Sequence, residues 1–131
     1  MASLQTILKA FNDQLGEFLE DIHSIFPEDK SILKSKNSLL ALKKVNPKII
    51  IQVWFNNITI PYKEHIDDGN ISFFFEKDYS NDLNSFEGTE NIQEGIDRLR
   101  EPIKNMGKDN QDKCMQYIQN LTGLSLLYNR Q

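Results

Sequence analysis

The chain has 131 residues, of which 39% are hydrophobic and 26% charged, and its formal net charge is −4. This length suits one domain, and the composition excludes both a disordered tail and a membrane protein, because no run approaches the roughly 18 to 20 apolar residues that cross a bilayer. The N-terminus lacks the ordered regions of a signal peptide, so we expect a cytoplasmic protein.

Near the start of the chain, apolar residues recur at alternating spacings of four and three, which predicts an amphipathic helix from Ser3, its N-cap, to Phe26, where Pro27 stops it. Only another apolar surface can cover such a seam, so the helix is expected to pack inside a bundle or against a second copy of the chain. The seam consists of Leu4, Leu8, Phe11, Leu15, Phe18, Ile22 and Ile25.

Asp29 can cap a second helix that ends before Asn46-Pro47, and asparagine followed by proline favours a third helix starting there. The run 49–55 is β-branched and aromatic enough for a buried strand, and periodicity cannot separate the two, but the cap favours a helix. Pro61 is expected to kink or restart the chain before a break at 67–70. The apolar residues of the second helix are Ile32, Leu33, Leu39, Leu40 and Val45.

The second half of the chain predicts a short aromatic helical segment at 71–79 and a mobile loop at 80–88. A fourth helix is expected from Thr89, strained near its end by Pro102, and Gly107 makes the turn into a fifth. The apolar seams of these two helices are Ile92, Ile96, Leu99, Ile103 and Met106, then Cys114, Tyr117, Leu121, Leu124 and Tyr128.

The predicted fold is all-α, a single domain over residues 1–131 with a bundle of about five helices, and it shows no catalytic motif. The chain lacks a P-loop, a dinucleotide-binding glycine fingerprint, a nucleophile elbow and a His-Glu-x-x-His pair. His23 and His65 lie far apart, without metal-ligand spacing, and Cys114 falls on an apolar helix face, as expected of a buried, inert thiol. We therefore expect no enzyme, no cofactor, no metal and no small-molecule substrate.

Charge is distributed unevenly along the chain, because the segment Lys30–Lys48 carries +6 without an acid and the rest carries −10. This asymmetry predicts either a surface for phosphate or an acidic partner, or a solvated helix face. The segment has no arginine and no aromatic residue, which disfavours sequence-specific nucleic-acid recognition. Its candidate interaction residues are Lys34, Lys36, Lys43, Lys44 and Lys48.

Three consecutive phenylalanines occupy positions 73–75. They cannot all point inward from one helix, because consecutive residues step by about 100° around its axis. We expect one of them, Phe74, to lie at a groove or an oligomer contact, where aromatic side chains are favoured.

Several segments follow one another in a familiar order: Phe11 to Phe18, Phe26-Pro27-Glu28-Asp29, Lys43-Lys44-Val45-Asn46-Pro47-Lys48, Ile60-Pro61-Tyr62, Phe73 to Tyr79, and Leu121 to Tyr128. This order resembles a family of small helical proteins encoded by large nucleocytoplasmic DNA viruses, the giant viruses of algae and protists. The resemblance implies a soluble, mainly helical viral protein in the infected-cell cytoplasm, at the viral factory or in the virion. It implies no activity and no functional residues.

Three classes of function remain open at this point. The leading one is a non-enzymatic structural or protein-interaction protein, a virus-encoded virion or viral-factory component, whose partner is another protein or a second copy of the chain, with no role for a membrane. The alternative is a nucleic-acid-associated accessory protein that uses the Lys30–Lys48 segment. The weakest is a hydrolase or other enzyme whose site is assembled from scattered carboxylates and His65.

Overall fold

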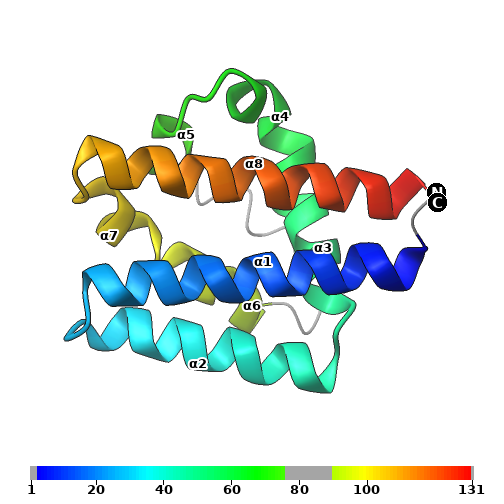
Figure 1. Cartoon of the computed structure of the whole chain (residues 1–131), viewed down its shortest axis with the longest axis horizontal. Helices are drawn as coiled ribbons and strands as arrows, with labels where there is room; N and C mark the ends of the chain where they lie inside the picture. Colours follow the sequence, from blue (N-terminus) through cyan, green and yellow to red (C-terminus); the bar gives the residue numbers. More distant parts are fainter. Residues whose placement is uncertain (1–2, 76–89, 131) are drawn as a thin grey trace.

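The computed structural model describes residues 3–75 and 90–130 (Figure 1). Of these residues, 85% are helical and none forms a strand, so the prediction of an all-α fold is confirmed. The predicted loop at 80–88 lies outside the described residues. The elements are α1 (Leu4–Ile25), α2 (Lys30–Val45), α3 (Ile49–Trp54), the π-helix η1 (Phe55–Thr59), α4 (Ile60–Asp67), α5 (Ser72–Phe75), α6 (Glu90–Asp97), α7 (Arg100–Lys104) and α8 (Lys108–Arg130).

The first two helices begin where their capping side chains place them. The Ser3 hydroxyl accepts a hydrogen bond from the backbone N–H of Thr6 at 3.1 Å. The Asp29 carboxylate accepts from the backbone N–H groups of Ser31 and Ile32. Because the first N–H groups of a helix have no partner inside it, these caps stabilise both starts as predicted.

The run 49–55 is helical rather than a strand, but α3 starts at Ile49 and not directly after Asn46. Asn46 instead ends α2, where its N–H donates to the carbonyl oxygen of Leu42 at 2.8 Å. Its own carbonyl oxygen accepts from the N–H of Ile49 at 3.3 Å, so one residue closes α2 and leads into α3.

Elements α3, η1 and α4 form a continuous helical rod that is kinked near Pro61, as predicted. Proline has no N–H, and its ring clashes with the carbonyl group four residues earlier. The backbone accommodates it through a wide turn, in which the N–H of Ile60 donates to the carbonyl oxygen of Phe55, and through a non-helical Tyr62 with φ −123° and ψ 16°. The rod ends before Gly69, whose φ of +72° is readily adopted only by glycine.

The predicted fourth helix consists of two helices, α6 and α7, separated by a turn at 98–99. Pro102 explains the break. As the third residue of α7, it lies in a first turn, where a backbone N–H would have no helical partner, whereas in one long helix it would remove an internal hydrogen bond. Gly95 allows α6 to approach α2 closely, because a Cβ there would lie 3.3 Å from Cγ of Leu39.

Helices α1 and α8 run side by side in opposite directions, and α2 lies along the other side of α1 (Figure 1). The seam of α1 is buried against these helices and α3 over most of its length, although its first member, Leu4, is 45% exposed. One hydrophobic cluster contains residues from all the elements above. Trp54 lies fully buried in it, edge to face with the ring of Phe11 at 6.2 Å.

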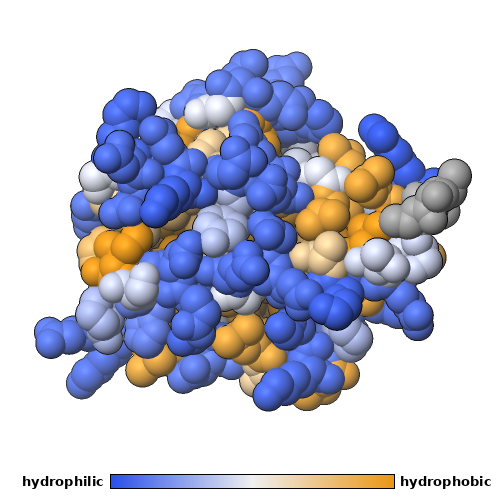
Figure 2. All heavy atoms as spheres, viewed as in Figure 1, coloured by the Kyte–Doolittle hydropathy of each residue, from blue (hydrophilic) through white to orange (hydrophobic). Residues whose placement is uncertain are grey.

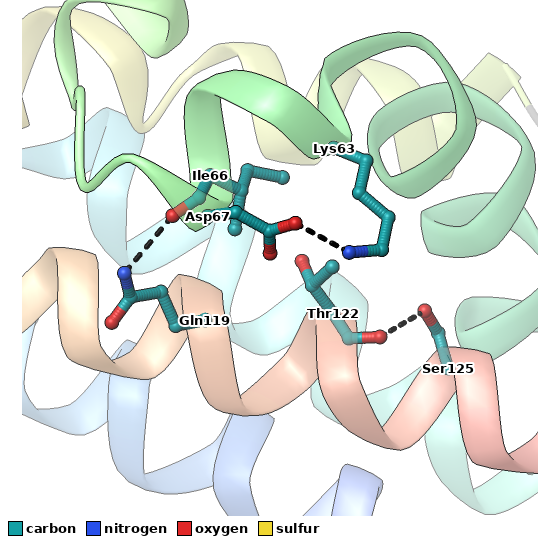
Figure 3. A network of polar contacts seen from close by, with 6 residues as sticks. All are labelled: Lys63, Ile66, Asp67, Gln119, Thr122 and Ser125. Carbon is teal, nitrogen blue, oxygen red and sulfur yellow. Dashed lines mark hydrogen bonds and ion pairs between the residues drawn. The ribbon is translucent and has the colours of Figure 1, made fainter.

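Polar side chains join the rod to α8, and Figure 3 shows one of these contacts, between Gln119 of α8 and the carbonyl oxygen of Ile66 in α4. The indole N–H of Trp54 donates to Oγ1 of Thr122 at 3.1 Å. The hydroxyl of Ser125 donates to the carbonyl oxygen of Thr122 at 2.8 Å and lies 2.7 Å from Oγ1 of Thr59. Farther along the rod, the side-chain amide of Gln119 donates to the carbonyl oxygen of Ile66 in α4 at 2.9 Å. Buried polar groups are therefore paired along this contact.

Two fully buried serines offer a matched test of such pairing. Ser35 in α2 has a hydroxyl with no hydrogen-bond partner among the described residues, whereas the hydroxyl of Ser125 has two. We predict that Ser35→Ala raises the free energy of unfolding by about 1 kcal/mol and that Ser125→Ala lowers it by about 1 to 2 kcal/mol. Both serines are inside helices, so the gain in helix propensity is common to the two variants. Urea unfolding followed by circular dichroism measures both, and equal effects would contradict the prediction.

Candidate interaction surface

The candidate lysines are divided between two faces of α2. Lys36 points toward α1, and its side chain is only 14% exposed. Its Nζ lies 2.6 Å from Oε1 of Glu20 and 3.2 Å from Nδ1 of His23. Lys36 therefore joins two helices of the same chain and is not part of a free surface.

Lys43 also faces α1. Its Nζ would be 3.9 Å from a Cβ on Gly16, and it lines a surface depression together with acids of α1. The hydrogen bond from Lys9 lowers the pKa of the Asp13 carboxyl from its ordinary value, and the positive charge of Lys43 lowers it further. The acids of α1 in this depression are Asp13, Glu17, Glu20 and Asp21. Some of the lysines of the Lys30–Lys48 segment thus interact with the acids of α1 across the contact between α1 and α2.

The opposite, outer face of α2 combines positive charge with exposed apolar side chains. Lys34 and Lys44 are exposed on it, and neither forms an ion pair with residues 3–75 or 90–130. Val45 is 82% exposed and Leu33 is 39% exposed. Lys48 is exposed in the turn that follows α2.

Together with α6, this face forms a groove of about 500 Å³. Helical spacing aligns Lys34, Ala41 and Val45 in one stripe of α2. Across from it, Glu94 of α6 forms an ion pair with Arg98, which lies in the turn after α6. We call this site the α2–α6 groove; it is lined by Lys34, Ser38, Ala41, Leu42, Val45, Glu94 and Arg98.

Phe74 is not an interaction residue, and that prediction is wrong. Its side chain is fully buried, and it packs edge to face against Phe73 at 6.0 Å. The reason is Arg100, whose guanidinium lies 4.4 Å from the centre of the Phe74 ring and donates to the Phe74 carbonyl oxygen at 2.6 Å. The same guanidinium donates to Oδ1 of Asp97 at 2.8 Å, which compensates its burial. Residues far apart in sequence thus cover the ring.

A second groove of about 690 Å³ lies between α1 and α8. Hydrophobic side chains gather on this face over the C-terminal half of α8 (Figure 2). Only one of the lining side chains, Arg130, is charged. We call it the α1–α8 groove; it is lined by Ala10, Gln14, Gln119, Asn120, Gly123, Leu124, Leu126, Leu127 and Arg130.

Sequence reasoning missed this second groove, although two signals point to it. Leu124, Leu126 and Leu127 are too closely spaced to face one direction from a helix, so at least one remains near solvent. Gly123 lies in the interior of α8, where glycine is unfavourable. Leu127 is 45% exposed as a result of this crowding.

The remaining chemistry of the described residues gives no reactive centre. Cys114 is buried, with its thiol 3.5 Å from Sδ of Met106, and burial raises its pKa to about 12. Within residues 3–75 and 90–130, no three His, Cys, Asp or Glu side chains gather as a metal site would require. In that part of the chain, none of the helices combines the length and apolar composition needed to cross a bilayer.

Comparisons of the chain with models of protein families, with curated proteins and with solved structures found no match. Function must therefore be inferred from the two grooves and the charges around them.

The division of the lysines can be tested by stability. We predict that Lys36→Gln lowers the free energy of unfolding by about 1 kcal/mol, because it removes a largely buried stem and an ion pair. The matched variant Lys34→Gln, on the exposed face of the same helix, should change it by less than about 0.5 kcal/mol. Urea unfolding measures both, and equal values for the two variants would show that Lys36 is as free as Lys34.

Proposed function

We propose that this protein is a non-enzymatic interaction protein that binds a partner protein in the α2–α6 groove. The exposure of Val45 carries this proposal, since 82% of this apolar residue meets solvent at the edge of a groove. Burial of a valine side chain by a partner contributes roughly 1.5 kcal/mol or more. Leu33 adds a second exposed apolar side chain on the same helix.

Charge defines the chemistry of the partner. Lys34 lines the groove and is exposed, Lys44 is exposed on the same helix, and Arg98 is paired with Glu94 inside the groove. An acidic segment with an apolar stripe, laid along α2 as a helix, would satisfy both the cations and the apolar side chains. A strongly basic segment would meet like charges and be rejected.

The setting of this interaction follows from the sequence resemblance alone. We propose a virus-encoded component of the virion or the viral factory, working in the host cytoplasm. The order of segments along the chain supports this proposal, and the interaction in the α2–α6 groove does not depend on it.

The proposal predicts where a partner protein will be cross-linked. A photoreactive amino acid at Val45 should form a covalent adduct with one discrete protein in cells that produce this chain naturally, identified by mass spectrometry. The same amino acid at Glu101, which is exposed on α7, should not. Adding Lys34→Glu to the Val45 variant should abolish the adduct, because the substitution repels an acidic partner. Adducts of equal yield from positions 45 and 101 would contradict the proposal.

The exposed lysines also support a second candidate, nucleic-acid binding, which makes a different prediction. If Lys34, Lys44 and Lys48 contact phosphates, duplex DNA should bind with an affinity that falls by orders of magnitude between about 50 and 200 mM salt, and Lys34→Glu with Lys44→Glu should abolish it. Under the protein-partner proposal, no duplex binding survives physiological salt, since the acids of the rest of the chain repel the same polyanion. Fluorescence anisotropy with labelled duplex decides between the two candidates.

A further inference from the structure

We propose that the α1–α8 groove is a self-association surface, in which a second copy of this chain packs its own α8 against the first. This inference is independent of the partner protein in the α2–α6 groove, because the two grooves share no lining residue.

Gly123 is the first reason. It lies inside the 23-residue helix α8 and is exposed to solvent, and a Cβ there would have nothing within 4 Å. By contrast, a Cβ on Gly95 would press on a side chain of α2 at 3.3 Å. Glycine disfavours a helix, and no neighbour within the described chain requires one at position 123. A second molecule that packs closely against position 123 would require a glycine there.

The second reason is that the protruding side chain, Leu127, and the gap left by Gly123 belong to the same helix. Leu127 projects one turn beyond Gly123, and the two positions lie on the same side of α8. A twofold axis midway between them, with the helices antiparallel, places Leu127 of each copy over Gly123 of the other. The contact is then made twice and is self-complementary, as a closed dimer requires.

Charge selects a second copy as the occupant. A twofold contact brings a face against the same face, so a strongly charged face repels itself. The exposed face of α1 carries acids such as Glu17, and the outer face of α2 carries lysines. The α1–α8 groove holds one charged residue, Arg130, and the twofold arrangement sets each Arg130 opposite the uncharged Asn120 of the other copy. The two arginines then lie about 15 Å apart along the helices.

The expected association is weak. Nine residues line the groove, compared with about 20 to 30 on each side of a standard stable interface. We therefore expect a dissociation constant in the micromolar range and a dimer that forms and separates readily.

Sedimentation equilibrium of the full chain tests the proposal. From about 1 to 300 µM, a range that spans the expected dissociation constant, the average mass of the wild type should rise from the 15.2 kDa of the monomer toward twice that value. Leu127→Glu should remain monomeric over this range, because it places a carboxylate in the apolar contact. Gly123→Gln should also remain monomeric, since its side chain fills the hole.

Two controls separate loss of the contact from loss of the fold. Gly123→Gln should raise the midpoint of thermal unfolding while it abolishes association, because glutamine favours a helix and meets no neighbour in the monomer. Val45→Glu makes the same kind of change as Leu127→Glu on the other groove and should associate like the wild type. A wild type that stays monomeric at every concentration overturns the proposal, as does a dimer that neither Leu127→Glu nor Gly123→Gln weakens.

Discussion

The burial of Trp54 is the constraint on which the arrangement of the other helices depends. Its ring is too large to be covered by one neighbour, so both Phe11 of α1 and the inner face of α8 are needed around it. Its single N–H must also find an acceptor away from water, and Thr122 supplies one. Because the packing of the Trp54 ring and its hydrogen bond must both be satisfied, the rod has one position between α1 and α8. That position also brings Thr59 of the rod to the hydroxyl of Ser125.

Charge pairing between α1 and α2 explains which lysines remain available for the proposed interaction. Lys36 and Lys43 face the acidic side of α1, and the remaining lysines of α2 face outward with Val45 and Leu33. The outer face of α2 therefore joins positive charge to apolar area, a combination that suits an acidic protein segment better than a uniform phosphate surface. The groove along α8 lacks such charge and suits an identical face. The two proposed contacts thus lie on two sides of α1.

Arg100 shows how a buried charge can settle the position of a short helix. A helix of four residues, such as α5, has almost no stability of its own. The guanidinium of Arg100 binds its backbone at Phe74 and covers the ring of the same residue, while Asp97 balances the charge. This bonding attaches α5 to α7 and leaves Phe74 with no surface for a partner.

The sequence by itself determined the all-α class and the starts of α1 and α2, because caps, prolines and apolar periodicity act over a few residues. It could not determine which residues the other helices cover. Val45 is one of the apolar residues of α2 but lies exposed at the α2–α6 groove, whereas Phe74, which we expected at a contact, is buried and covered by Arg100. Lys34 and Lys36 are alike in sequence, yet only Lys36 meets an acid of α1. Only the tertiary structure decided these outcomes, because burial and charge pairing depend on helices that are distant along the chain.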